Sequence, residues 1–207
     1  TILIKTGIKK ENRFCISIEK VWNMSKNYTE KILSELYTFL EGVKGTEYND
    51  ICEAIENANH IFLAGIGRTG YIMRCFAMRL AQLGFRVYWI GDSNTCSARV
   101  GDLLILGSGS GETEGLINYI KKAVSLKMKK IVFTTNPQST LAGHADVLKV
   151  LKADTKYQTI RNKKSVQPMG SLFEEALLIT LEAIVLDLME RNHITEEYMQ
   201  KKHANLE

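Results

Sequence analysis

The segment 108–113, Ser-Gly-Ser-Gly-Glu-Thr, has the residue types that hold a phosphate group. Its glycines let the backbone curl around an anion, and its three hydroxyls can donate hydrogen bonds. The helix expected after it would add a favourable partial charge at its first turn. Ser108, Ser110 and Thr113 are therefore candidate phosphate ligands, with a helix-capping box at Ser110–Thr113 as the structural alternative.

A second glycine-rich segment, Gly65-Ile66-Gly67-Arg68-Thr69-Gly70, follows an apolar stretch and matches the dinucleotide fingerprint G-x-G-x-x-G. A dinucleotide site also needs an acidic residue near the end of the next strand, and Asp92 lies near there. Two other interpretations fit the same residues. Arg68 and Thr69 could contact a compact phosphorylated ligand, or the glycines could serve a tight turn.

The hydroxyl-rich loop 108–113 decides between these interpretations. A dinucleotide fold has no need of a second anion-binding loop, whereas a phosphate monoester can use both loops. We therefore expect a small phosphorylated ligand and no nucleotide cofactor. A third polar segment, 134–140, is expected to consist of ordinary loop residues.

Glu174 is the candidate for acid–base chemistry. On a helix predicted over 171–191, it falls within an apolar arc made by Leu177, Leu178, Leu181, Ile184, Val185 and Leu188. A carboxylate in such an arc is costly unless it is paired or used, and burial would raise its pKa toward that of a general base. Its neighbour Glu175 is predicted to be solvated. The structural alternative for Glu174 is a favourable carboxylate in the first turn of the helix.

Among the four histidines, His203 lies on a polar C-terminal segment where no role in the core is evident. Composition alone predicts a surface histidine at this position. The long helix before it is apolar around most of its circumference, which indicates burial from several sides and hence a partner chain. Association with such a chain would carry the segment around His203 toward a neighbouring subunit.

Strands and helices alternate along the chain, and the strands are nearly continuous apolar runs. This pattern predicts an α/β fold, a five-stranded parallel sheet covered by helices on both faces as a three-layer sandwich. Ligands of such sheets bind at the carboxyl ends of the strands, where both glycine-rich segments fall. The predicted strands are 60–64, 86–90, 102–107, 130–135 and 145–150, and the predicted helices are 27–42, 46–57, 68–83, 112–126, 171–191 and 195–205.

Two segments stand outside this pattern. Residues 1–23 show no sustained helical period, so they are expected to be a leader, with Met24 as the suspected start of a single domain over 24–207. A short strand pair is the other interpretation of 1–23. The polar segment 152–167 is expected to be a long loop, and long loops in compact domains are often functional.

Composition sets limits on the class of protein. With 207 residues, 45% hydrophobic and 24% charged, the chain has the make-up of an ordinary globular domain. A net charge of +4 is too small to indicate nucleic-acid binding. The four cysteines include no C-x-x-C pair, so neither a zinc site nor a disulfide framework is expected. No apolar run approaches the roughly 20 residues that span a bilayer, and a cytoplasmic protein is expected.

Four stretches together resemble the 6-phospho-3-hexuloisomerases of the sugar isomerase (SIS) domain family. They are AGIGRTGYIMRCFAMRLAQLGF (64–85), LLILGSGSGETE (103–114), PMGSLFEE (168–175) and HANLE (203–207). The first two are shared by many sugar isomerase domains, and the last two are more particular to the hexuloisomerases. The resemblance covers residues 27–207. Gly107 departs from it, since a bulkier apolar residue is expected there, and the glycine could loosen the hydroxyl-rich loop.

The resemblance implies a flavodoxin-like fold and an isomerase that interconverts 3-hexulose 6-phosphate and fructose 6-phosphate through a cis-enediol. It implies a homotetramer without a metal or nucleotide, acting after 3-hexulose-6-phosphate synthase in the ribulose monophosphate route of formaldehyde fixation or detoxification. Ser108, Ser110 and Thr113 would hold the phosphate, helped by residues 67–69. Glu174 would occupy the position of the base, and His203 that of the active-site histidine. Related sugar isomerases complete their sites with a histidine of the next chain, so we expect His203 to serve the Glu174 of a different subunit.

Two other functions use the same kind of sheet. A sugar-phosphate-binding regulatory module would need a DNA-binding domain, for which residues 1–59 offer only two plausible helices. It would also have no use for a carboxylate in an apolar arc. An NAD-dependent oxidoreductase of the Rossmann kind would need the dinucleotide interpretation of residues 65–70.

Overall fold

The computed structural model describes residues 27–40, 48–151 and 165–206. The predicted leader 1–23, the suspected start at Met24 and most of the predicted loop 152–167 lie outside the described residues.

Five parallel strands form one sheet in the order β2-β1-β3-β4-β5. This is the flavodoxin-like order, and it confirms the predicted α/β fold. The strands are β1 (Ile61–Gly65), β2 (Val87–Trp89), β3 (Leu103–Gly107), β4 (Lys129–Thr134) and β5 (Val147–Val150). Gly65 and Gly107 pair at the carboxyl ends of β1 and β3, so the two glycine-rich segments leave the sheet side by side.

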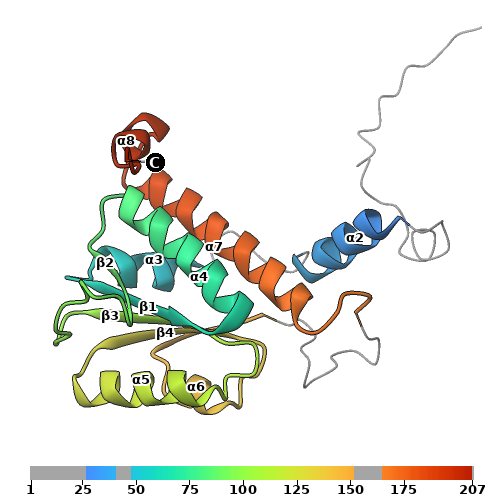
Figure 1. Cartoon of the computed structure of the whole chain (residues 1–207), viewed down its shortest axis with the longest axis horizontal. Coiled ribbons are helices and arrows are strands. Elements are labelled where there is room, and N and C mark those ends of the chain that lie inside the picture. The colour runs from blue at the N-terminus through green and yellow to red at the C-terminus, as the bar shows by residue number, and fades with distance from the viewer. Residues whose placement is uncertain (1–26, 41–47, 152–164, 207) are drawn as a thin grey trace, which may run out of the picture.

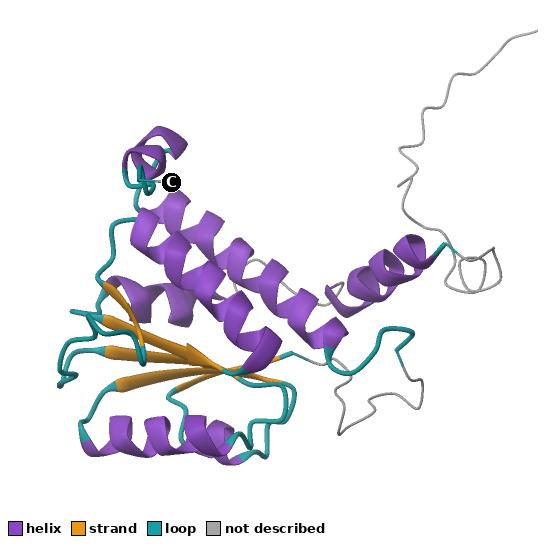
Figure 2. Cartoon of the chain, viewed as in Figure 1, coloured by secondary structure: helices purple, strands orange, loops and turns teal. Residues whose placement is uncertain are grey.

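Helices cover both faces of the sheet, as Figures 1 and 2 show, so the predicted three-layer sandwich is confirmed. One face carries α3 (Asn49–Glu56), α4 (Gly67–Gln82) and α7 (Ser171–Arg191), and the other carries α5 (Glu114–Ser125) and the short α6 (Thr140–Gly143). Two helices lie away from the sheet at opposite ends of α7. They are α2 (Tyr28–Leu40), near its start, and α8 (Glu196–Lys201), near its end.

The two apolar cores meet at the central strand β3, all of whose residues are buried. Leu103 and Ile105 belong to the core under α4 and α7, whereas Leu104 and Leu106 belong to the core above α5. A strand buried on both faces is apolar at every position, which is why the sequence predicts it so clearly.

Helix α7 spans 171–191, as predicted, but the predicted apolar arc is wrong at one residue. Leu178 is 38% exposed, while Phe173 and Ala176, outside that arc, are buried. The arc assumed a single buried face, whereas α7 packs on α2, α3 and α4 together. Within the described ranges, no helix is both long and apolar enough to cross a membrane.

Candidate active site

A cavity of about 850 Å³ opens at the carboxyl ends of β1 and β3. The chain leaves β1 toward one edge of the sheet and β3 toward the other, and such a switch point forms the ligand crevice of open α/β sheets. Three segments and Asn136 line the cavity. The segments are residues 66–69 before and within α4, residues 107–113 after β3, and residues 168–174 around the start of α7.

These segments bring together most of the residues that the sequence singles out. The candidate phosphate ligands Gly67, Arg68, Thr69, Ser108, Ser110 and Thr113 all line the cavity, and so does Glu174. His203 does not. The candidate phosphate ligands and the candidate base, more than 60 residues apart in the chain, thus face one space.

The hydroxyl-rich loop is held partly by its own side chains. Ser108 Oγ accepts a hydrogen bond from the Gly111 amide at 3.1 Å and lies 3.1 Å from Thr113 Oγ1. Ser110 Oγ accepts from the Glu112 amide at 3.2 Å. Helix α5 begins at Glu114 with Thr113 as its N-cap residue, so Ser110 does not cap the helix and the capping-box alternative at Ser110–Thr113 is wrong. Ser108 is buried and Ser110 is half-buried, which leaves Ser110 the more accessible hydroxyl.

The third polar segment supports this loop from outside. Thr135 Oγ1 donates to the Gly109 carbonyl at 2.8 Å, and both the amide and the hydroxyl of Thr140 donate to the Glu112 carboxylate at 2.7 Å. The Thr140 bonds hold the pKa of Glu112 below its ordinary value. Asn136 reaches the cavity itself. The expectation of ordinary loop residues therefore misses a supporting role, whose only sequence signal is the polar run after β4.

Glycine is required at two places in the site by close approach. A side chain on Gly70 would bring a carbon to 2.6 Å from the Gly65 carbonyl oxygen, so the G-x-G-x-x-G pattern lets α4 pack on the end of β1. Gly111 has a φ of +69°, and a side chain there would collide with the Ser139 hydroxyl.

Asp92, the acidic residue of the dinucleotide interpretation, pairs with Arg74 at 3.3 Å.

The expected loosening of the loop at Gly107 finds no support in the structure. Gly107 is buried, and it pairs with Gly65 in β1 and Phe133 in β4. A side chain on Gly107 would place a carbon 2.8 Å from Met73 Sδ, so Met73 fills the space that a bulkier residue would need.

Glu174 lies in the first turn of α7 and pairs with Arg68 from the first turn of α4, with Oε2 2.7 Å from Nε. The Glu174 side chain is 13% exposed and that of Arg68 is 66% exposed. Burial raises the pKa of Glu174, Arg68 opposes the rise through its charge and hydrogen bond, and the charge of Glu175 adds to it. The net pKa is raised, as a general base near neutral pH requires.

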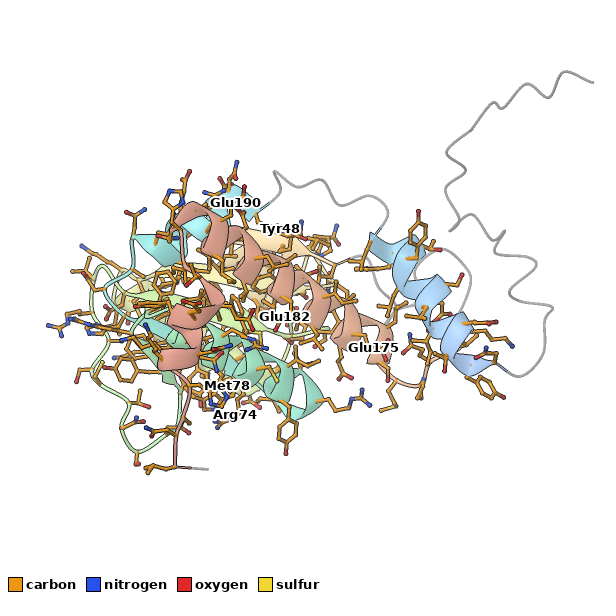
Figure 3. All side chains as sticks on the ribbon, turned by 90° about the horizontal axis from the view of Figure 1, so that it is seen from above. Tyr48, Arg74, Met78, Glu175, Glu182 and Glu190 are labelled. Carbon is orange, nitrogen blue, oxygen red and sulfur yellow. The ribbon has the colours of Figure 1, made fainter. Side chains whose placement is uncertain are left out.

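The prediction that Glu175 is solvated is wrong. Its carboxylate is half-buried, and among the described residues Oε2 is buried without a hydrogen-bond partner. Figure 3 places Glu175 near the start of α7, on the side toward α2. Because α7 packs on more than one neighbouring helix, the Glu175 carboxylate is also partly buried.

His203 lies at the other end of α7 from Glu174, just after α8 (Figure 1). Helix α7 has 21 residues, which corresponds to a length of about 30 Å at 1.5 Å per residue. The ring is exposed, and its Nδ1 lies 2.8 Å from the Ala204 carbonyl oxygen. Within one chain the structure therefore does not bring His203 to the cavity.

A metal site is not evident in the part of the chain that the structure describes. No group of three or more His, Cys, Asp or Glu side chains is placed there to hold a metal ion. The cavity offers hydroxyls, backbone amides, one guanidinium and two carboxylates, a set that suits a phosphorylated organic ligand.

Comparison with known proteins identifies the family. The family model of the SIS domain matches residues 54–179. The chain belongs to the SIS domain family. It is 39% identical over 180 residues to the 3-hexulose-6-phosphate isomerase of Bacillus subtilis, covering 87% of this chain and 97% of that protein. It is 37% identical to the 3-hexulose-6-phosphate isomerase of Methanocaldococcus jannaschii, covering 84% and 91%.

A solved structure shows the same architecture. The crystal structure of a protein from Methanococcus jannaschii, from which a 3-hexulose-6-phosphate isomerase function was inferred, superposes with a TM-score of 0.74. The two sequences are 34% identical, and the match covers 86% of this chain and 96% of the other.

Proposed function

We propose that this protein is a 6-phospho-3-hexuloisomerase, which interconverts 3-hexulose 6-phosphate and fructose 6-phosphate. One observation carries the proposal. Glu174, a carboxylate with a raised pKa, faces the same cavity as the hydroxyl-rich loop, in a chain whose relatives at 37–39% identity are named for this reaction.

The phosphate of the substrate binds at the hydroxyl-rich loop, where Ser110 and the amides at the start of α5 can donate to it. Arg68 and Thr69 complete this part of the site from α4. The phosphate takes no part in the bond changes, so its binding energy serves to fix the reacting carbons in place.

Glu174 acts as the base. It removes the proton from C2 of 3-hexulose 6-phosphate, and the electron pair forms the C2–C3 double bond of a cis-enediol. Return of the proton to C3 and closure of the carbonyl at C2 give fructose 6-phosphate. A raised pKa suits both steps, since the carboxylate must first accept the proton and then release it.

A second group must move a proton from the C2 oxygen to the C3 oxygen, and His203 of a neighbouring subunit is proposed for it. The length of α7 between Glu174 and His203 supports a contribution from another chain, as does the apolar surface on α4 and α7. The proposed assembly is a tetramer. 3-Hexulose-6-phosphate synthase, which makes the substrate from formaldehyde and ribulose 5-phosphate, is the proposed pathway partner.

The test is a coupled assay in which formaldehyde, ribulose 5-phosphate and added synthase supply the substrate. The expected product is fructose 6-phosphate, formed only when this protein is present. Synthase alone is the control and should stop at 3-hexulose 6-phosphate. Accumulation of the hexulose phosphate in the presence of folded protein would contradict the proposal.

A further inference from the structure

Arg68 has two possible partners in the same cavity. The resemblance assigns it to the substrate phosphate, whereas the structure pairs it with Glu174 through Nε at 2.7 Å. Within the described ranges, Glu174 is the only carboxylate with which Arg68 forms an ion pair. One guanidinium group therefore has two candidate partners in the cavity, the Glu174 carboxylate and the phosphate of a ligand.

Geometry allows Arg68 to change partners. Its side chain is 66% exposed and starts from the first turn of α4. It lines the same cavity as the hydroxyl-rich loop that is proposed to bind the phosphate. Glu174 is only 13% exposed and is fixed in the first turn of α7. The mobile member of the pair is therefore the arginine. A phosphate ester carries nearly two negative charges, so it attracts a guanidinium more strongly than one carboxylate does.

The charges that face Glu174 determine what such an exchange would do. Arg68 on α4 is the opposing charge, and Glu175 on α7 is the like charge. Glu112 also lines the cavity, and its carboxylate accepts hydrogen bonds from Thr140. When Arg68 leaves, Glu174 keeps its burial and the repulsion from Glu175 but loses the influence that lowers its pKa. Departure of the arginine thus makes Glu174 a stronger base.

We propose that Arg68 is a positioning residue that exchanges partners, holding Glu174 in the empty site and moving to the phosphate when substrate binds. This inference rests on the proposed function and extends it, because it couples phosphate binding to activation of the base. The empty enzyme keeps its carboxylate paired and ionised. The base is released when a phosphorylated sugar is in place.

Competition for one guanidinium can be measured without turnover, using inorganic phosphate as the probe. If Glu174 and phosphate compete for Arg68, Glu174→Gln should tighten phosphate binding about fivefold, the equivalent of about 1 kcal/mol for a partly exposed ion pair. Phosphate would be titrated at mildly alkaline pH, and binding followed by NMR shifts of the Gly109 and Gly111 amides.

Glu175→Gln is the matched control, since it removes the same charge from the adjacent residue without touching the Arg68 pair. It should change phosphate affinity by less than about twofold, because its charge acts only at longer range. In an Arg68→Gln background, phosphate should bind more weakly than to the wild-type protein, and adding Glu174→Gln should bring no further gain.

Equal tightening in Glu174→Gln and Glu175→Gln would overturn the exchange, because it would reflect general repulsion. A gain that persists without Arg68, no gain at all, or no phosphate binding in any variant would overturn it as well. If the phosphate titrations give the expected result but the isomerase assay yields no fructose 6-phosphate, only the proposed function would be contradicted.

Discussion

Two opposing influences act on a single carboxylate, Glu174. Burial at the start of α7 disfavours its charge, and Arg68 favours it. In the empty site, burial without Arg68 would leave Glu174 protonated, and therefore inactive, over a wider range of pH. During the reaction, a lasting pair with Arg68 would keep Glu174 too weakly basic to remove a proton from carbon.

Glu174→Gln keeps the shape of the side chain and removes its basicity. We expect kcat to fall by about 10²- to 10⁴-fold, the usual contribution of general acid–base catalysis. Fructose 6-phosphate should still bind, as measured by calorimetry. Glu175→Gln should have a mild effect on kcat. Should the two variants behave the other way round, Glu175 would be the base.

The raised pKa of Glu174 also predicts a pH profile. The base works only when ionised, so kcat/KM should fall as the pH decreases through a pKa above the ordinary carboxyl value of 4.5. Arg68→Gln removes the group that lowers this pKa, so the acidic limb should move to higher pH. An acidic limb at the same pH in both proteins would show that Arg68 does not act on the base in the free enzyme.

Ser108 and Ser110 belong to one loop but should respond differently to mutation. Ser110→Ala should raise KM about 10- to 100-fold, from the loss of about 1.5–3 kcal/mol in a hydrogen bond to a charged group. Ser108 is buried and bonded to the Gly111 amide, so Ser108→Ala should also lower the melting temperature. Steady-state kinetics and thermal unfolding of both variants provide the measurement. An unchanged KM in Ser110→Ala would mean that its hydroxyl serves only the loop.

At the scale of elements, α2 contributes to the site although it lies outside the three layers (Figure 1). Its Glu35 carboxylate accepts hydrogen bonds from Ser165 Oγ at 2.7 Å and from the Val166 amide at 2.9 Å. Residues 165–167 lead directly into Pro168–Gly170, which form one wall of the cavity, and then into the turn that carries Glu174. Helix α2 therefore anchors a wall of the site.

Glu35→Ala should release this wall while leaving the sheet intact. We expect kcat/KM to fall about tenfold, the equivalent of about 1.4 kcal/mol, since hydrogen bonds to a charged group are worth at least that much. Glu30→Ala is the matched control, an exposed carboxylate on the same helix, and should be close to wild type. Glu35→Asp should recover part of the loss. Equal kinetics for Glu35→Ala and Glu30→Ala would show that α2 does not influence the site.

Local pattern predicts the elements of this fold better than it predicts their contacts. The strands are apolar runs buried on both faces, and α7 is a long apolar helix, so both are clear in the sequence. The predicted helix 195–205 is too long because the described helix spans only Glu196–Lys201 and buries no residue. Helix α6 has only four residues, at the end of the polar run 134–140, which is too few to show a helical period.

In the candidate site, too, the sequence predicts where residues fall along the chain better than it predicts their contacts. Residues after β1 and β3 could be predicted, because parallel strands bring their carboxyl ends to one edge of the sheet. The Arg68–Glu174 pair, the Thr140 bonds to Glu112 and the burial of Glu175 could not. Each depends on how separate elements pack, and no period within one element contains that information.

At the scale of the whole molecule, the described chain leaves large apolar side chains uncovered on the outer sides of α4 and α7. They are Tyr71 and Met78 on α4, and Ile179 and Leu186 on α7. Figure 3 labels Met78 beside Arg74 on α4. Apolar groups gathered on two adjacent helices are typical of a surface that binds another protein chain. Association of subunits would cover them and could bring a distant residue to each cavity.

His203 is the residue that such an assembly is expected to bring. If it serves the Glu174 of a neighbouring subunit, Glu174→Gln and His203→Ala chains should each be nearly inactive alone. Unfolded together and refolded, they should form mixed oligomers. In these, some sites combine Glu174 from one chain with His203 from the other, and activity should reappear. A histidine acting within its own chain could not produce such a site, because every chain in the mixture carries one defect.

The control is a mixture of Glu174→Gln chains with chains carrying both substitutions, which contains no intact Glu174 and should stay inactive. Native mass spectrometry would establish that mixed oligomers form in both preparations. Mixed oligomers that form in the first preparation yet remain inactive would place His203 in its own chain's site or outside catalysis. The length of α7 argues against the first of these outcomes, since about 30 Å of helix separates the two residues within one chain.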